Sequence, residues 1–392
     1  MGKRFDDASA QVGVAIVGAG PAGLVLGNLL LDRGVDCVVL ERRERAAVVG
    51  RARAGFLAPG AVETLTRNGL GDGLLERGRT HRTCRFRGEH GEFTLDYSRA
   101  GRREAHTVYP QQDLVRDLLS AFVERGGDIR FAAPVREVTR GTVRLHDGGE
   151  VRARYVAGCD GHRGVTRAAL TARGTRTARW DHGVTWLAVL AAAGPSMPAV
   201  GYALHERGFA GHMARTDTVT RYYLQVPRGT DPADWSDDRI WTELATRMRT
   251  AEHGPLRTGA VLERAAVDLR CDVLERPGAD RLWLAGDAAG LISPSAAKGA
   301  NLAVVQAATL APALAAALAH GDSKGLDRYA DDCLPRVWRA HEFSHWMSGL
   351  LHGPVGHTPE ARYGRALQYA RLESLRTSRA HQDHFAESYT GI

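Results

Sequence analysis

The 392-residue chain lacks several features that would assign it to particular classes of protein. No hydrophobic run approaches the length of a membrane span, and residues 1–10 (MGKRFDDASA) lack the apolar core of a signal peptide. We therefore expect a cytoplasmic protein that does not enter a membrane. The cysteines are few, scattered and without metal-ligand spacing, which predicts reduced, mostly buried thiols and no metal site; they are Cys37, Cys84, Cys159, Cys271 and Cys333.

Lysine is also scarce, so arginine supplies nearly all of the positive charge behind the net charge of +7. The arginines are spread over all segments and are not clustered with aromatic residues, a distribution that argues against nucleic-acid binding. A solvated basic surface is the simplest interpretation. Attraction of an anionic substrate and a phosphate-bearing cofactor is the functional alternative. The length allows two or three domains.

A dinucleotide fingerprint occupies residues 14–23 (VAIVGAGPAG). It reaches from a predicted strand through a glycine turn into a helix, and a second strand follows that ends at Glu41. Gly18 allows the tight turn, Gly20 lets the backbone approach a pyrophosphate, and Gly23 allows close packing of the helix on its strand. Glu41 can accept hydrogen bonds from both ribose hydroxyls. An ordinary glycine turn is the alternative, but the complete strand–helix–strand context favours nucleotide binding.

Two further turns place an aspartate directly after a strand and before a helix. Asp160 lies in residues 155–167 (YVAGCDGHRGVTR), and Asp287 lies in residues 284–289 (LAGDAA). An aspartate in such a turn caps the following helix, and it can also reach a ribityl hydroxyl of a flavin nucleotide. Taken singly, each motif is more often a structural cap.

The rest of the chain alternates between helical and strand patterns, which indicates an α/β protein with a β-rich insert. We predict helices over residues 112–124, 237–249 and 300–319, and a hairpin turn at residues 147–149 (DGG).

The three motifs, in this order, resemble those of the class A flavoprotein aromatic hydroxylases, and most closely the 4-hydroxybenzoate 3-monooxygenases among them. The resemblance covers nearly the whole chain and rests on segments such as GAGPAGL, VYPQQDLVRDLL, GCDGHRGVTR, RYYLQVP and LAGDAAGLISPSAAKGANLA. It implies a GR2-type Rossmann-like FAD-binding domain, an inserted β-sheet substrate domain and a helical C-terminal part. The implied boundaries are 1–80, 107–184 and 275–330 for the FAD domain, 81–106 and 185–274 for the substrate domain, and 331–392 for the C-terminal part.

The resemblance also implies the activity and the substrate contacts. Such enzymes use FAD, NADPH or NADH, and molecular oxygen to hydroxylate a para-hydroxylated aromatic acid ortho to its phenol, through a flavin C4a-hydroperoxide. Arg215 matches the arginine that grips the substrate carboxylate, for which a guanidinium fork is well suited, and Tyr223 matches a tyrosine that assists it. Tyr202 and Tyr389 match a pair that binds the phenol and relays its proton, with His81 at the outer end. Without the resemblance, Arg215 is equally explained as a surface arginine and each tyrosine as a core residue.

The remaining expected contacts come from the same resemblance. The Pro294 carbonyl is expected to face the substrate hydroxyl, and Trp186 is expected in the substrate pocket. The FAD contacts are expected to be Gly18, Gly20, Pro21, Ala22, Gly23, Glu41, Arg42, Arg51, Arg53, Gln111, Asp160, Arg221, Asp287, Ala297, Lys298, Gly299, Ala300 and Asn301. The nicotinamide cofactor is expected at Arg42, Arg53, Arg163, Arg167 and Arg270. A homodimer is the usual state of these enzymes.

Several positions depart from the pattern. Met213 stands where the 4-hydroxybenzoate enzymes have a serine on the carboxylate, and Gly211 replaces a leucine of the pocket wall. Ala296 replaces a loop glycine and Gly290 a histidine. These changes leave open a hydroxylase, including a decarboxylative one, that acts on a bulkier phenol or a hydroxypyridine. A binding protein on the same fold without redox activity is a third alternative, which the intact FAD motifs and the tyrosine pair disfavour.

Overall fold

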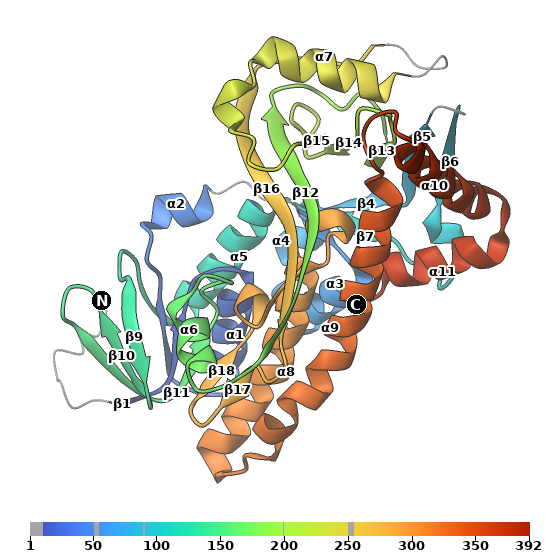
Figure 1. Ribbon diagram of the computed structural model, residues 1–392. Coiled ribbons are helices and arrows are strands. Elements are labelled where there is room, and N and C mark those ends of the chain that lie inside the picture. Colours follow the sequence, from blue (N-terminus) through green and yellow to red (C-terminus); the bar gives the residue numbers. More distant parts are fainter. Residues whose placement is uncertain (1–10, 51–54, 89–90, 199, 250–254) are drawn as a thin grey trace.

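The computed structural model describes residues 11–50, 55–88, 91–198, 200–249 and 255–392 (Figure 1). Within these residues, a mainly parallel sheet carries the dinucleotide fingerprint. Its central strands are buried on both faces, which explains their continuous apolar runs. Its strands are β1 (Gln11–Val17), β2 (Cys37–Leu40), β8 (Asp128–Arg130), β9 (Val135–Thr139), β10 (Thr142–Leu145), β11 (Glu150–Gly158), β17 (Gly278–Ala279) and β18 (Leu282–Leu284).

Helices cover this sheet, and all of those named below except α6 contribute to the largest core cluster. The helix that follows the fingerprint is apolar nearly all round and packs between the sheet and two further helices. Its one buried amide, Asn28, donates from Nδ2 to the carbonyls of Leu24 and Leu118 at 2.9 Å each. The helices are α1 (Pro21–Leu31), α2 (Arg45–Val49), α3 (Pro59–Arg67), α4 (Asp72–Arg77), α5 (Gln111–Glu124), α6 (Val165–Thr171) and α8 (Gly299–His320).

A second, mainly antiparallel sheet forms the other half of the molecule. Two long strands, β12 and β16, run from this half down toward the fingerprint sheet (Figure 1). Helix α7 (Asp237–Met248) packs on one face of the second sheet, which leaves the other face for the site described below. The strands are β5 (Thr83–Gly88), β6 (Gly91–Asp96), β12 (Thr177–Ala191), β13 (Val200–Ala203), β14 (Ala210–Ala214), β15 (Thr220–Val226), β16 (Val261–Leu274) and β19 (Gly290–Leu291).

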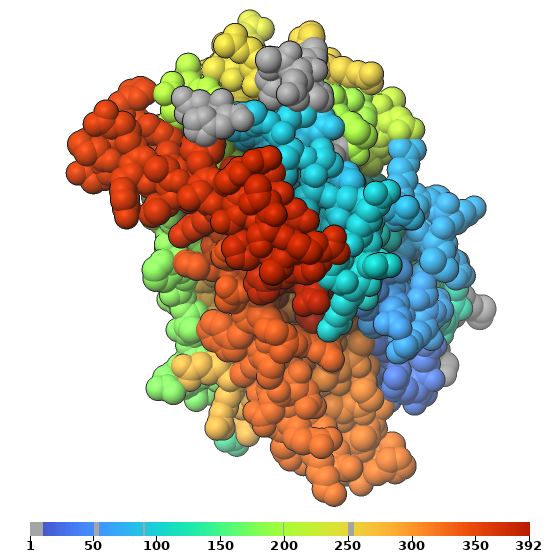
Figure 2. Space-filling view, turned by 90° about the vertical axis from the view of Figure 1, so that its right-hand side faces the viewer, coloured from blue at the N-terminus to red at the C-terminus, as the bar shows by residue number. Residues whose placement is uncertain are grey.

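A small third sheet and the C-terminal helices close the space between the halves. The small sheet holds β3 (Phe56–Leu57), β7 (His106–Val108) and β4 (Arg79–His81). Figure 2 shows the C-terminal helices, in red, lying against the segment that includes β6 and β7, in cyan. The backbone N–H of Gly101 donates to Asp383 at 2.8 Å across this contact. The helices are α9 (Lys324–Leu351), α10 (Pro359–Thr377) and α11 (Arg379–Thr390).

Helix α8 corrects one expectation from the sequence. At 22 residues, with a mean hydropathy of 1.9 in its most apolar window, it is long and apolar enough to cross a membrane by length and composition. The expectation that no hydrophobic run reaches that length was therefore wrong. The helix lies in the core instead, where 56% of that window is buried and α1, α3 and α9 pack against it.

The other predicted elements are confirmed. Helices α5, α7 and α8 match the three predicted helices to within two residues at each end. The turn at residues 147–149 joins β10 to β11, where the N–H of Gly149 donates to Asp147. All five cysteines are buried and none is in a disulfide. The mixed α/β class with a helical C-terminal part is therefore confirmed.

The contact between α1 and the glycine turn that precedes it predicts a clear stability effect. A Cβ atom on Gly23 would lie 2.0 Å from the Gly18 carbonyl oxygen, whereas a Cβ on Gly20 would meet nothing within 4 Å. We expect Gly23→Ala to lower the free energy of unfolding by about 1–3 kcal/mol, because the helix must move away from the Gly18 carbonyl. Gly20→Ala is the matched control, and it should lower the free energy of unfolding by less than half as much. Denaturant unfolding of flavin-free protein measures both, and equal losses would contradict the packing argument.

Candidate active site

One cavity of about 1080 Å³ runs from the fingerprint turn to the face of the second sheet. At one end it is lined by Gly18, Gly20 and Glu41, and at the other by Tyr202 and Tyr389. Residues from both large sheets and from the C-terminal helices therefore contribute to a single space. Such a cavity can hold a dinucleotide and a small substrate in contact with each other.

The fingerprint end of the cavity fits a dinucleotide. Gly18 has φ +105°, and a Cβ there would lie 2.5 Å from the Cys159 carbonyl oxygen, so glycine is required at this turn. Gly20 is open toward the cavity, and no side chain caps the helix that begins at Pro21. Its first N–H groups and its dipole are thus available to a phosphate. Pro21 and Ala22 also line the cavity.

The acidic residues of the three motifs all line this end of the cavity. Glu41 is buried and accepts backbone N–H bonds from Ala19 at 2.9 Å and Arg43 at 3.0 Å. Each of its oxygens keeps a second lone pair, which a ribose hydroxyl can use. Asp160 caps α6, accepting from the N–H of Thr166 at 3.1 Å and from the hydroxyl of the same residue. Burial raises the pKa of Asp160, which Thr166 in part offsets.

The loop before α8 forms the part of the cavity between the two ends. Ala297, Gly299 and Ala300 line it, with Ala297 in the left-handed region at φ +53°. The Asn301 side chain instead points away from the cavity into the protein interior. There it donates to the carbonyls of Phe56 and Ala297 and accepts from the N–H of Ala58 at 2.8 Å. Lys298 also points away from the cavity, as described below. The loop is therefore held rigidly from behind while its backbone faces the cavity.

The substrate end is built by strand register. Directly opposed residues on β13, β14, β15, β12 and β16 form one row across the second sheet, and all of its members line the cavity. Opposed residues point to the same face of a sheet, so the row is a wall. The row consists of Tyr202, Gly211, Tyr223, Ala188 and Ala265. A second row holds Met213, Arg221, Leu190 and Glu263, of which all but Leu190 line the cavity.

Gly211 does not leave an empty space in this wall. A Cβ at this position would lie 2.9 Å from the Phe209 ring, so the ring occupies the space that a side chain would need. Phe209 packs on Trp186 with ring centroids 5.5 Å apart, and both residues line the cavity. Trp186 donates from Nε1 to His352 Nε2 at 2.6 Å, which fixes its orientation. The wall is therefore aromatic, and the Phe209 ring fills the extra space that a glycine at position 211 was expected to leave in the substrate pocket.

Arg215 lies just beyond the wall, and its guanidinium is buried. It donates from Nη2 to Gln112 at 3.2 Å, while Nη1 has no hydrogen-bond partner among the described residues. Burial and the neighbouring Arg221 lower its pKa to about 10, and Tyr223 acts in the opposite direction. Arg215 is not among the described residues that line the cavity. A buried cation with an unpaired donor is nevertheless suited to an anionic group.

The tyrosine pair closes the opposite side of the substrate end. The hydroxyls of Tyr202 and Tyr389 lie 2.9 Å apart and are hydrogen-bonded. Burial raises the pKa of both phenols, so both remain protonated. Lys298 donates to the Tyr389 carbonyl at 2.7 Å and to the Gly391 carbonyl, which fixes the end of α11. Pro294 lines the cavity too, and its carbonyl accepts from the N–H of Ala297 at 3.0 Å.

His81 lies near this pair but does not bond to it. Its Nδ1 is 2.9 Å from the hydroxyl of Tyr97, and its Nε2 accepts from the N–H of Val200 at 3.1 Å. Burial lowers its pKa to about 4. His106 lies opposite His81 on the small sheet, and its ring centroid is 4.8 Å from that of Tyr389.

Of the other residues expected to contact FAD or the nicotinamide cofactor, some line the cavity and others do not. Gln111, Arg42, Arg163, Arg221 and Asp287 line the cavity. By contrast, Arg167 is buried in an ion pair with Asp272 at 2.7 Å, and the Arg270 side chain is 56% exposed. Two expected contacts lie outside the described residues, Arg51 and Arg53.

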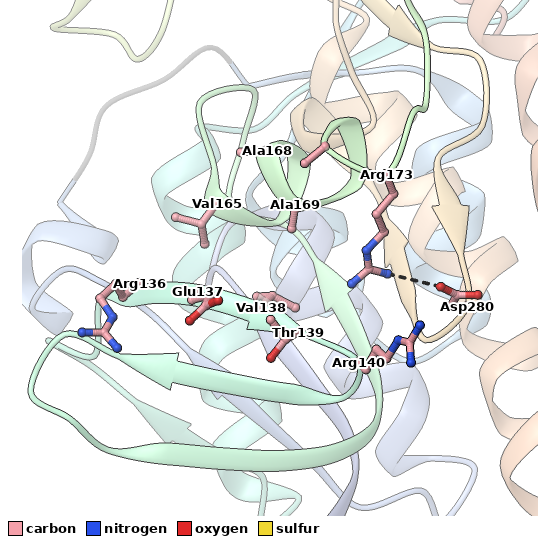
Figure 3. A pocket seen from close by; sticks show the side chains of 11 residues that line it. Arg136, Glu137, Val138, Thr139, Arg140, Val165, Ala168, Ala169, Arg173 and Asp280 are labelled. Carbon is pink, nitrogen blue, oxygen red and sulfur yellow. Dashed lines mark ion pairs between the residues drawn. The ribbon is translucent and has the colours of Figure 1, made fainter.

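A second pocket lies on the far side of the fingerprint sheet, between β9 and α6 (Figure 3). Arg136, Arg140 and Arg173 line its rim above an apolar floor, and Arg173 pairs with Asp280 at 3.7 Å. None of the residues singled out in the sequence as catalytic or cofactor-binding lines it. The chemistry is therefore assigned to the first cavity.

Sequence reasoning missed several residues of the site. Phe209 could have been found, because strand alternation places it on the same face as the predicted residue Gly211. Tyr97 and His106 carry no such signal. Pairing of β4 with β7 and the approach of α11 bring them to the tyrosine pair.

Comparison with known proteins agrees with this geometry. The family described as FAD binding domain matches residues 11–344. The chain is 35% identical to the p-hydroxybenzoate hydroxylase of Acinetobacter baylyi over 390 residues, covering 97% of this chain and 95% of that protein. It is 29% identical to the 3-amino-4-hydroxybenzoate 2-monooxygenase of Streptomyces cremeus, covering 88% and 89%.

Among solved structures, the fold is shared with p-nitrophenol 4-monooxygenase from Pseudomonas putida DLL-E4, at a TM-score of 0.82 and 20% identity, covering 97% of this chain and 98% of that one. The resemblance found in the sequence is confirmed by the family match and by the first relative. The chain belongs to the FAD binding domain family and is a class A flavoprotein aromatic hydroxylase.

Proposed function

We propose that this flavoprotein hydroxylates a para-hydroxylated aromatic acid ortho to its phenol, as in the conversion of 4-hydroxybenzoate to 3,4-dihydroxybenzoate. The acid, NADPH or NADH, a proton and O₂ would give the catechol acid, the oxidised nicotinamide and water. The observation that carries the proposal is the single cavity that joins a dinucleotide cradle to a buried tyrosine pair. The buried Arg215 interacts electrostatically with Tyr223 and Arg221, which line this cavity.

The carboxylate end depends on Arg215 and Tyr223. The unpaired Nη1 of Arg215 is a buried donor, and such a donor costs free energy until an acceptor reaches it. A substrate carboxylate supplies both the acceptor and the countercharge. Met213, opposite Arg221 on the neighbouring strand, offers bulk but no donor. Arg215 and Tyr223 would therefore hold the carboxylate without the hydroxyl that a serine provides.

The phenol end depends on Tyr202. Its hydroxyl is protonated and lies in the cavity, so it can donate to the substrate oxygen while it bonds to Tyr389. Donation to the charged form lowers the pKa of the substrate phenol, and the resulting phenolate carries more electron density at the ortho carbon.

The cofactor end fits FAD. Gly18, Gly20 and the start of α1 would hold the pyrophosphate and Glu41 the adenosine ribose, while the Ala297–Gly299 backbone would face the flavin ring. Bound FAD supplies the redox and oxygen chemistry, and the protein supplies position and proton control. The aromatic wall of Trp186 and Phe209 excludes water from the reacting atoms.

A ring-substituted acid is a second candidate substrate. Met213 alters the carboxylate end, and one relative acts on 3-amino-4-hydroxybenzoate. The filled space beside Gly211 favours a single-ring acid over a large polycyclic phenol.

A substrate panel tests the proposal directly. Oxidation of NADPH or NADH by the FAD-loaded enzyme should accelerate when 4-hydroxybenzoate is added, and 3,4-dihydroxybenzoate should form. The same assay with 3-amino-4-hydroxybenzoate and with hydroxypyridines separates the alternatives. If 4-hydroxybenzoate neither stimulates oxidation nor perturbs the flavin spectrum, the proposed substrate is wrong.

Arg215→Gln tests the carboxylate contact. Loss of a charge-assisted bond of about 2 kcal/mol should weaken 4-hydroxybenzoate binding roughly thirtyfold, while binding of the neutral 4-hydroxybenzamide should change little. Flavin difference spectra measure both dissociation constants. Arg228→Gln, at an exposed ion pair with Asp181, is the control and should leave both unchanged. Equal weakening of the acid and the amide would show that Arg215 does not meet the carboxylate.

A further inference from the structure

The end of helix α9 supplies the hydrogen-bond partner of the aromatic wall. Trp186 is 4% exposed and lines the cavity, and its Nε1–H donates to Nε2 of His352 at 2.6 Å. His352 directly follows α9 and is not among the described residues that line the cavity. The polar edge of the indole is therefore directed away from the substrate end, toward a residue outside the lining of the cavity.

The two bonds of His352 fix the position of its proton. An indole N–H can only donate, so Nε2 of His352 accepts and the proton of the neutral ring is on Nδ1. Nδ1 donates to the Ser348 carbonyl at 2.9 Å. Burial lowers the pKa of His352 to about 4, the bond to Ser348 acts in the opposite direction, and the charge of His182 lowers the pKa further. His352 is thus neutral near neutral pH, and both of its nitrogens are hydrogen-bonded.

The same face of α9 also holds the loop before α8. Ser344, Ser348 and His352 follow one another at intervals of four residues, which places them on one face of the helix and its end. Ser344 donates to the Ser293 carbonyl at 3.0 Å, and the hydroxyl oxygens of Ser348 and Ser295 lie 2.8 Å apart. Ser295 lines the cavity. This helix face therefore connects the aromatic wall to the loop on another side of the same cavity.

We infer that His352 is a positioning residue for the substrate, because it holds Trp186 so that the indole presents its carbon ring, and not its N–H, to the cavity. This inference rests on the proposed function. Trp186 contacts the rings of Tyr223 and Phe209, with centroids 4.7 and 5.5 Å away, and all three residues line the cavity. His352 also packs edge-on against Phe209 at 5.1 Å. Without its acceptor the buried indole N–H is unpaired, and the indole must turn toward another acceptor, which moves the surface that the substrate ring contacts.

The indole N–H resonance of Trp186 tests the bond itself. The FAD-loaded enzyme is labelled with ¹⁵N at its seven tryptophans, and Trp186→Phe identifies the resonance. We expect this N–H to be downfield and protected from solvent exchange. His352→Phe, which keeps a ring beside Phe209 but removes the acceptor, should move the resonance upfield and quicken its exchange roughly tenfold or more. His352→Gln, whose amide oxygen can replace Nε2, should retain the wild-type signal. His345→Phe is the control, because His345 is exposed on the same helix and contacts Trp180 instead.

Substrate binding and product yield test the consequence of the bond. In His352→Phe the dissociation constant of 4-hydroxybenzoate, measured by flavin difference spectra, should rise roughly tenfold, because the wall is misplaced. A larger share of the oxidised NADPH or NADH should yield hydrogen peroxide instead of 3,4-dihydroxybenzoate. His352→Gln should restore both quantities, and His345→Phe should change neither. In the Trp186→Phe background, which lacks the donor, His352→Phe should change the dissociation constant less than about twofold.

The possible outcomes separate the two proposals. If 4-hydroxybenzoate does not perturb the flavin of the wild-type enzyme, the proposed substrate is wrong, while the indole resonance still decides whether the bond exists. An indole resonance that is unchanged in His352→Phe would overturn the inference, as would a shifted resonance with unchanged binding and product yield. Equal effects of His352→Phe and His352→Gln, or additive effects in the Trp186→Phe background, would show that His352 acts through packing alone and would also overturn it.

Discussion

Lys298 holds the two sides of the active site together. Its Nζ is buried and donates to the carbonyls of Tyr389 and Gly391, while its chain neighbours Ala297 and Gly299 face the cavity. Burial lowers its pKa to about 7, which shows how much the site disfavours an unpaired charge there. The lysine thus connects the cofactor loop to the last turn of α11. The Tyr202–Tyr389 hydrogen bond depends on that connection, since Tyr389 reaches the sheet only from this turn.

The substrate wall depends on a different constraint, the register of the second sheet. Tyr202, Gly211 and Tyr223 are opposed on three adjacent strands, so a shift by one residue on any strand would turn its side chain out of the cavity. Phe209 and Trp186 fill the space beside them. The wall is therefore rigid, and we propose that specificity depends on Met213 and on the charge of Arg215 beyond it.

The sequence predicted the fingerprint, the helices and the fold class because these depend on local patterns. The turn at Gly18 and the acid at Glu41 have a fixed spacing, and α5 and α7 have a clear apolar period. Contacts between residues that are far apart in the sequence were not predictable in the same way. His81 and His106 are 25 residues apart and meet through β-pairing, and Tyr97 reaches Tyr389 only through tertiary packing. Composition alone could not show that apolar α8 is buried between three other helices.

The central claim is that the tyrosine pair ionises a phenol held in this cavity. The most direct measurement is an ultraviolet difference titration of 4-hydroxybenzoate bound to the FAD-loaded enzyme, which follows phenolate absorbance as the pH rises. The account predicts a phenol pKa about one unit or more below that of the free acid in the wild-type enzyme and in Tyr222→Phe, whose hydroxyl bonds to Ser196 on the other face of the sheet. In Tyr202→Phe the pKa should return toward the free value. An unshifted phenol pKa in the wild-type enzyme, or a full shift retained in Tyr202→Phe, would contradict the account.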